Sequence, residues 1–306
     1  MAAPQTGIFA LGTESHAYLE FDLVSDVEPA AAVERVASLR EPRTTIGGVN
    51  LVTGFRPELW ALVAPADAPR GVSGFNQPLT GPTGYVMPAT QHDVVVWLNG
   101  ASYDVVFDLS RAVVSALRGV AEPVHEMVGF VYHHDLDLTG FIDGTENPTL
   151  VEATNVALIP EGAPGAGGSV LLLQQWQHAS HAWENLPAPE QEKVMGRRKA
   201  DSAELDPVPE DSHVGRTDQE VFGKIFRRNV AFGTVTQHGT IFVGFCRDQS
   251  ILQAMLESMI GLRADAIDRL TTFTMPTTGA YYLIPSADAL AARGANERAD
   301  PPEEPD

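Results

Sequence analysis

The acidic residues of Asp135–Pro148, DLDLTGFIDGTENP, are spaced so that they could do chemistry in two different ways. Taken from Asp135, the stretch nearly fits the loop of an EF-hand, in which oxygen ligands at fixed places bind calcium. The residues at the first, third, fifth, sixth and twelfth places of that loop are Asp135, Asp137, Thr139, Gly140 and Glu146. Taken from Gly140, the stretch is a turn that presents one carboxylate, Asp143.

The residues on either side favour the turn over the calcium loop. An EF-hand needs a helix on each side, whereas the preceding segment MVGFVYHH is rich in strand-forming residues and Pro148 stands where the second helix should begin. A plain Asp-Gly turn, in which Asp143 only caps backbone amides, is the simplest structural alternative.

Two later segments offer partners for Asp143. DSHVGRTD (211–218) contains His213 among polar residues, and FRRNVAFG (226–233) contains Arg227, Arg228 and Asn229. Because neighbours in an extended segment face opposite sides, we expect Arg228 to point away from the other two. The histidines of HASH (178–181) are interpreted as surface residues.

Composition excludes several classes of protein. The 306 residues carry a net charge of −20, which argues against a nucleic-acid partner because phosphate binding draws on clustered Lys and Arg. The single cysteine, Cys246, excludes an intrachain disulfide and a zinc site built on several thiolates. The sequence has no apolar run of about 18 residues and no secretory signal at its start, so it predicts no membrane span and a cytoplasmic location.

Hydrophobic periodicity predicts two α+β halves that meet near residue 140. Strands are expected at 17–24, 93–100, 127–132, 168–177, 239–246 and 279–285. Helices are expected at 28–40, 104–119, 188–200 and 250–261. The acidic, proline-rich end has the composition of a disordered tail.

In this order, GFIDGTENP, SHVGRTD, RRNVAFG and HGTIFVGFCR make a specific pattern. The chain resembles the dye-decolourising peroxidases, most closely their B-type branch, from PQTGIF near the start to TGAYYLIPS near residue 286. The resemblance implies α+β architecture with two ferredoxin-like domains, 1–140 and 141–290, each with an antiparallel sheet. The second domain would hold most of one haem b, and residues 291–306 would form the disordered tail.

The resemblance also implies roles for the polar candidates. His213 would be the axial ligand of the haem iron, with Asp143, Arg227 and Asn229 on the opposite face, where peroxide reacts. A carboxylate that accepts a hydrogen bond from the other ring nitrogen would make the imidazole more electron-donating, and Asp268 is the candidate partner.

The predicted function is a haem peroxidase that reduces hydrogen peroxide through a ferryl and porphyrin-radical intermediate and oxidises dyes or phenols by one-electron steps. The alternative is a haem-binding or haem-delivery protein in which His213 matters and Asp143 does not. The resemblance implies a homo-oligomer. Some relatives are cargo of encapsulin compartments through a C-terminal peptide, but the acidic tail here lacks an apolar docking segment, so the sequence does not favour that role.

Overall fold

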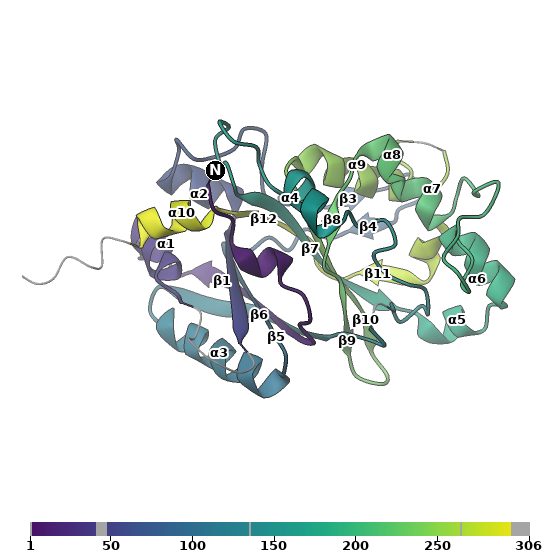
Figure 1. Cartoon of the computed structure of the whole chain (residues 1–306), viewed down its shortest axis with the longest axis horizontal. Coiled ribbons are helices and arrows are strands. Elements are labelled where there is room, and N and C mark those ends of the chain that lie inside the picture. The colour runs from purple at the N-terminus through teal and green to yellow at the C-terminus, as the bar shows by residue number, and fades with distance from the viewer. Residues whose placement is uncertain (1, 41–47, 135, 264, 295–306) are drawn as a thin grey trace, which may run out of the picture.

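The computed structural model describes residues 2–40, 48–134, 136–263 and 265–294. The first half of the chain runs strand, helix, strand, strand, helix, strand, with short elements inserted (Figure 1). Its elements are η1 (Thr6–Phe9), β1 (Ser15–Leu23), α1 (Pro29–Ala37), β2 (Val49–Phe55), α2 (Pro57–Val63), β3 (Leu79–Thr80), β4 (Val86–Met87), β5 (Val94–Gly100), α3 (Tyr103–Ala116) and β6 (Ala121–Phe130).

The second half repeats this order with more helices between its first two strands. Its elements are α4 (Leu150–Ala157), β7 (Ser169–His178), α5 (Ser180–Glu184), α6 (Ala188–Met195), α7 (His213–Thr217), α8 (Gln219–Phe222), β8 (Phe226–Arg227), β9 (Val230–Gly233), β10 (His238–Cys246), α9 (Gln249–Met259), η2 (Arg269–Thr272), β11 (Thr274–Pro276), β12 (Ala280–Ile284) and α10 (Ala287–Arg293).

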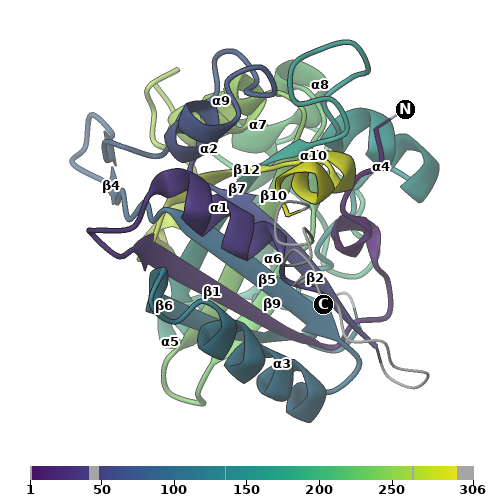
Figure 2. The same cartoon turned by 90° about the vertical axis from the view of Figure 1, so that its left-hand side faces the viewer.

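Both halves have the same sheet topology. The strand order is β6-β1-β5-β2 in the first half and β9-β10-β7-β12 in the second, with all neighbours antiparallel. This is the order of a ferredoxin-like sheet, which confirms the predicted architecture. The two sheets join edge to edge, because β2 pairs with β12 and β6 pairs with β9. Since all four edge strands are paired in this way, the sheets close into a barrel (Figure 2).

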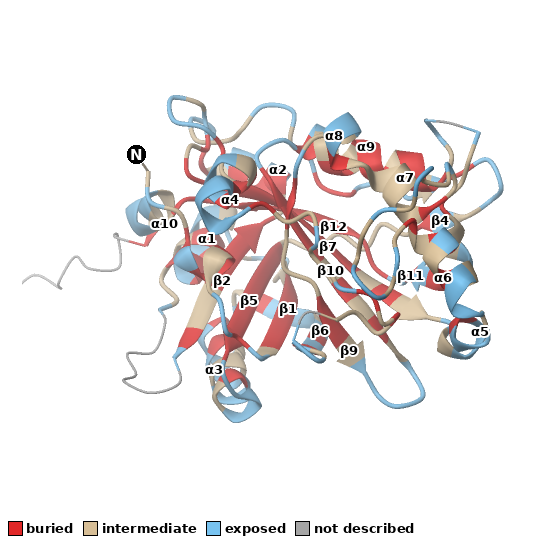
Figure 3. Cartoon of the chain, turned by 45° about the vertical axis from the view of Figure 1, so that its right-hand side comes forward, coloured by how far each residue is buried: buried red, intermediate tan, exposed pale blue. Residues whose placement is uncertain are grey.

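Strand alternation divides the apolar side chains into layers on the two faces of the barrel wall. On β7, Leu171 and Leu173 belong to the cluster inside the barrel, together with Trp97, whereas Leu172 and Trp176 belong to a cluster that packs under α9. A third cluster lies under α1 and α3 on the first half. Most of the long strands are accordingly buried along most of their length, β6 being more exposed, while the outward turns of the helices are exposed (Figure 3).

Two glutamines fasten the halves to each other. Buried Gln5 donates to the carbonyls of Thr53 and Pro285 at 2.8 and 2.9 Å and accepts from the Thr53 amide at 2.8 Å. It thereby supports the β2–β12 seam, where only the pair Leu283 and Phe55 is in register.

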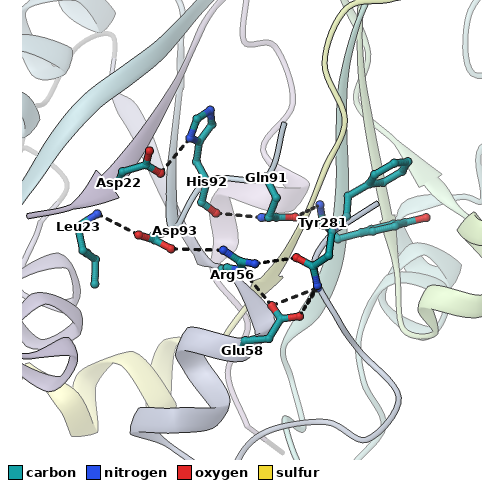
Figure 4. A network of polar contacts seen from close by, with 11 residues as sticks. Asp22, Leu23, Arg56, Glu58, Gln91, His92, Asp93 and Tyr281 are labelled. Carbon is teal, nitrogen blue, oxygen red and sulfur yellow. Dashed lines mark hydrogen bonds and ion pairs between the residues drawn. The ribbon is translucent and has the colours of Figure 1, made fainter. Parts of the chain in front are cut away.

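Gln91 makes the second connection, inside a network of polar contacts (Figure 4). Its Oε1 accepts the amides of Phe75 at 2.7 Å and of Tyr281 at 2.9 Å, so one side chain links a loop of the first half to β12. In the same network Arg56 contacts Glu58 at 3.3 Å and lies 3.9 Å from Asp93.

Most predicted strands and helices are present, with boundaries shifted by a few residues. One prediction needs correction: α10 continues to Arg293, so residues 291–293 are helical and not part of a disordered tail. Residues 295–306 of the predicted tail lie outside the described residues. No helix in the described part of the chain is both long enough and apolar enough to span a bilayer.

A carboxylate inside the barrel depends on one histidine for its counter-charge. Glu20 is 1% exposed, accepts from the Tyr282 hydroxyl at 2.6 Å and lies 2.9 Å from His125 Nδ1. The hydrogen bond with Glu20 raises the pKa of His125, against the smaller opposing effect of burial. This pair therefore stabilises the fold fully below the unfolded-state pKa of about 6.5, and the contribution disappears as pH rises through the higher folded-state pKa.

We expect His125→Gln to lower the free energy of unfolding more at about pH 6 than at about pH 9, by up to about 1 kcal/mol, because only the protonated imidazole compensates the buried carboxylate. Urea denaturation at both pH values measures this difference. His181→Gln, on the exposed face of α5, serves as the control. An equal loss at both pH values for His125→Gln would show that the ion pair does not contribute.

Candidate functional site

A cavity lies between the outer face of the second sheet and the helices that cover it. It contains about 1300 Å³ of empty space, a volume that includes the solvent at its open mouth. The apolar part of its wall comes from β7, β10 and α9, namely Leu172, Phe242, Leu252, Met255, Leu256 and Met259. Polar groups reach the cavity from α7, from β8, from the residue just before β9, and from the loop before α4.

His213 is the first residue of α7 and faces this cavity. The helix begins here because Ser212 caps it, its hydroxyl accepting from the Gly215 amide at 3.1 Å. His213 Nδ1 lies 2.7 Å from Oδ2 of Asp268, a residue that is 0% exposed. With Nδ1–H donating to that carboxylate, Nε2 is the ring nitrogen that remains for a ligand in the cavity.

Asp268 is itself held from two sides. Its Oδ1 accepts from the Leu270 amide at 2.8 Å as the cap of η2, and its own amide donates to the carbonyl of Met259 at 2.9 Å, at the end of α9. The carboxylate that orients His213 is therefore fixed by backbone contacts.

Asp143 lies on the loop between β6 and α4 and lines the same cavity. Gly140 and Gly144 have φ angles of +81° and +79°, a left-handed conformation that glycine adopts without strain, and they allow the tight turn on either side of Asp143. No described residue makes a hydrogen bond or ion pair with the Asp143 carboxylate. It is therefore available to a ligand.

Asn147 clamps this loop to β8. Its Nδ2 donates to the carbonyl of Arg227 and its Oδ1 accepts from the amide of the same residue, both at 2.9 Å. These two bonds bring Asp143 and Arg227 to the same part of the cavity wall. Asn147 could not be identified from the sequence, because nothing in GFIDGTENP distinguishes an asparagine that binds a distant backbone from one that caps its own turn.

The three residues after Phe226 point to alternate sides of the extended segment, as predicted. Arg227 and Asn229 line the cavity, whereas Arg228 does not, and its guanidinium lies over the ring of Trp97. Buried Nε of Arg227 has no hydrogen-bond partner among the described residues. Oδ1 of Asn229 accepts from the Val243 amide at 2.9 Å, which leaves the Nδ2 group to donate.

The interpretation of HASH as surface residues is wrong for its first histidine. His178 lines the cavity, and its Nε2 lies 3.1 Å from the hydroxyl of Thr240, which in turn donates to Asp137. Burial lowers the pKa of His178, although the nearby Asp137 raises it in part. The period of two along β7 would have placed His178 on the same face as Trp176, and this signal was available in the sequence.

The calcium alternative finds no support in the described residues. The segment before the loop is strand β6, so the first helix of an EF-hand is missing. Asp137 accepts from the Thr139 amide at 2.8 Å and from Thr240, and Glu146 pairs with Arg197. Asp135 lies outside the described residues, within which no three potential ligands gather around a common point.

We expect Asn147→Ala to lower the free energy of unfolding by about 1–3 kcal/mol, because it leaves the amide and carbonyl of Arg227 without partners. Urea denaturation measures the loss. Asn185→Ala, at the exposed end of α5, is the matched control and should change stability by less than about 0.5 kcal/mol. Equal effects of the two substitutions would show that the clamp does not hold the loop.

The groups around the cavity fit a haem. A planar macrocycle needs apolar walls, and its iron needs one neutral imidazole nitrogen on one side with room on the other. The cavity offers an apolar sheet face and an apolar helix face, together with the imidazole of His213, whose Nδ1 is already bonded to Asp268. It also offers the carboxylate of Asp143 and the guanidinium of Arg227, whose Nε has no partner among the described residues.

Comparison with known proteins gives the same result. Residues 134–289 match the family model "Dyp-type peroxidase, C-terminal". The chain is 31% identical over 294 residues to a dye-decolorizing peroxidase of Rhodococcus erythropolis, covering 93% of this chain and 82% of that protein. It is 33% identical over 252 residues to one of Brevibacterium linens, covering 79% of this chain and 68% of that protein.

Solved structures agree over nearly the whole chain. A dye-decolorizing peroxidase from Bacteroides thetaiotaomicron superposes with a TM-score of 0.87 at 28% identity, covering 96% of this chain and 99% of that one. DyPB from Rhodococcus jostii superposes with a TM-score of 0.83 at 32% identity, covering 94% and 97%. Variants of the latter protein were solved in complex with heme. The chain belongs to the dye-decolourising, or Dyp-type, peroxidase family.

Proposed function

We propose that the chain is a peroxidase that binds one haem b in this cavity, with His213 Nε2 as the axial ligand and with Asp143, Arg227 and Asn229 acting on hydrogen peroxide. The observation that carries the proposal is the hydrogen bond of 2.7 Å between His213 Nδ1 and buried Asp268, which leaves Nε2 free beside an apolar cavity that Asp143 and Arg227 also line. When bound, haem supplies the iron that takes oxidising equivalents from peroxide and passes them to donors one electron at a time.

On the His213 side, the protein controls how strongly the imidazole donates electrons. Asp268 accepts the Nδ1 proton in a hydrogen bond, so the ring acquires partial imidazolate character and favours oxidised iron. Because Asp268 is wholly buried and fixed by the Leu270 amide, this effect is not screened by solvent.

On the peroxide side, the task of the protein is to move one proton and to stabilise one charge. Asp143 takes the proton from the near oxygen of hydrogen peroxide and returns it to the far oxygen, so that the far oxygen leaves as water. Arg227, which stays protonated, stabilises the negative charge that develops on the leaving oxygen. Asn229 Nδ2 can hold the peroxide in place while its Oδ1 is fixed to Val243.

The donor class follows from the family. The relatives from Rhodococcus and Brevibacterium are named as dye-decolorizing peroxidases, which supports dyes and phenols as donors here. Membership of the B-type branch, assembly into a homo-oligomer, a cytoplasmic location and the absence of an encapsulin cargo role remain predictions from the sequence.

We expect His213→Ala to abolish the Soret band of the haem-reconstituted protein, because the iron loses the imidazole proposed as its ligand. We expect Asp143→Ala and Arg227→Ala to bind haem but to slow the spectral change caused by one equivalent of hydrogen peroxide by about 10²- to 10⁴-fold. Stopped-flow absorbance measures both properties.

Asp108→Ala and Arg111→Ala, on the exposed face of α3, change the same charges far from the cavity and serve as controls. Reaction with peroxide as fast in the Asp143 and Arg227 variants as in the parent would contradict the peroxidase mechanism and favour the haem-delivery alternative.

A separate prediction concerns Asp268. Asp268→Asn keeps the shape of the side chain but removes its charge, so the reduction potential of the haem iron should become more positive and the reaction with peroxide about 10- to 100-fold slower. Spectroelectrochemical titration measures the potential. Asp211→Asn, on the half-exposed segment before α7, is the control, and a potential that is the same in both variants would mean that Asp268 only positions the ring.

A further inference from the structure

A second cavity adjoins the first and has no role in the mechanism above. It contains about 1450 Å³ of empty space including its open mouth. Asp143, Arg227 and Asn229 line both cavities, so the two are separated by little more than these side chains. The rest of its wall comes from the segment before β1, from β8 and β9, and from the residues after β6.

Arg228 is the residue in this wall whose environment is unusual. Its Nη1 donates to the carbonyl of Ile8 at 2.9 Å, its Nη2 donates to the hydroxyl of Thr13 at 3.2 Å, and its Cζ lies 5.4 Å from the centre of the Trp97 ring. A guanidinium has five N–H donors, so these contacts fix its position while leaving donors for a ligand.

No carboxylate compensates this charge. Within the described residues, Arg228 has no acidic partner at ion-pair distance, and its neighbours inside the barrel, Tyr18, Trp97 and His16, are neutral. Burial and the charge of Arg228 lower the pKa of His16 to about 4, so the imidazole carries no charge at neutral pH. A largely buried guanidinium without a counter-charge is unfavourable, and an anion bound from the cavity side would relieve the cost.

The size and rim of the second cavity indicate what kind of anion it suits. Leu11 and Val131, 66% and 37% exposed, line the cavity together with Tyr132. Its charged lining residues are the two arginines, Arg227 and Arg228, and three carboxylates, Glu14, Asp137 and Asp143, of which Asp137 already accepts from Thr139 and Thr240. The cavity therefore combines apolar and aromatic surface with a guanidinium, Arg228, that two hydrogen bonds hold in place. A small inorganic anion would leave most of this space and surface unused. An aromatic carboxylate or sulfonate would use the cation, the apolar rim and the volume together.

We propose that the second cavity is the binding site for an anionic aromatic electron donor, held through its carboxylate or sulfonate by Arg228. This inference rests on the proposed peroxidase function and specifies its donor. Two such phenolic donors would each lose one electron and one proton, and one hydrogen peroxide would be reduced to two waters. The shared wall would keep the donor next to the peroxide site without admitting it there.

The test compares two probes with the same phenol ring, 4-hydroxybenzoate and uncharged 4-hydroxybenzyl alcohol. Their binding to the haem-loaded protein is measured by calorimetry at low salt without peroxide. We expect the wild-type protein to bind the benzoate about 10- to 100-fold more tightly, because a charge-assisted hydrogen bond forms only with the carboxylate. Arg228→Gln should remove this preference, and Arg228→Lys should retain part of it.

Two further variants separate a local contact from the overall charge. Glu14 lines the same cavity with an exposed carboxylate, so Glu14→Gln should tighten benzoate binding by about 2- to 5-fold through the loss of local repulsion. Arg111→Gln, on α3, removes one positive charge far from the cavity and should leave the preference for benzoate as in the wild type.

A wild-type protein that binds both probes equally, or a preference for benzoate that persists in Arg228→Gln, would overturn the inference. If circular dichroism shows that Arg228→Gln does not fold, the benzoate affinity of Glu14→Gln becomes the test. An affinity equal to that of the wild type would then contradict the proposal. Peroxide-dependent oxidation of the neutral alcohol and haem absorbance that depends on His213 report separately on the proposed function, so the two can fail independently.

Discussion

The antiparallel pairing of β7 with β10 is the constraint on which the rest of the structure depends. These strands form the centre of the second sheet and pair from Gly239 with Gln177 to Cys246 with Val170. Because side chains alternate along each strand, the same pair supplies Leu171, Leu173 and Val243 to the closed barrel and Leu172 and Phe242 to the cavity. A shift of one residue would exchange the two sets, placing the polar cavity residues inside the barrel.

The polar side chains of the cavity come from loops and short helices beside this sheet. A few hydrogen bonds hold each of these segments in place. His213 depends on Asp268, which depends on the backbone of Leu270 and Met259. The loop that carries Asp143 depends on the two bonds between Asn147 and Arg227. The site is therefore precise because loops are fastened to the sheet, and the fastening residues contribute nothing to the chemistry directly.

The sequence predicts the parts of this arrangement that have a local signal. Strand and helix periodicity identify β7, β10 and α9, and the motif residues bring Asp143, His213 and Arg227 to notice through their resemblance to a known family. Contacts between distant segments leave no such signal. Gln5, Gln91 and Asn147 bind backbone groups that are 16 to 280 positions away along the chain, and one amide side chain looks like any other in a sequence.

The position of Arg228 could also be predicted only in part from the sequence. Alternation along the strand predicts that it leaves the first cavity, but only the folded barrel places it over Trp97, beside a second cavity and without a carboxylate. Of the two neighbouring arginines, Arg227 lines both cavities and Arg228 lines the second alone.

The structure of the haem-loaded protein, determined by crystallography, tests the central claim most directly. The account predicts that His213 Nε2 ligates the iron, that Asp268 keeps its hydrogen bond to Nδ1, and that Asp143 and Arg227 face the opposite side of the haem. A haem ligated by another residue, or one with Asp143 and His213 on the same side, would contradict it.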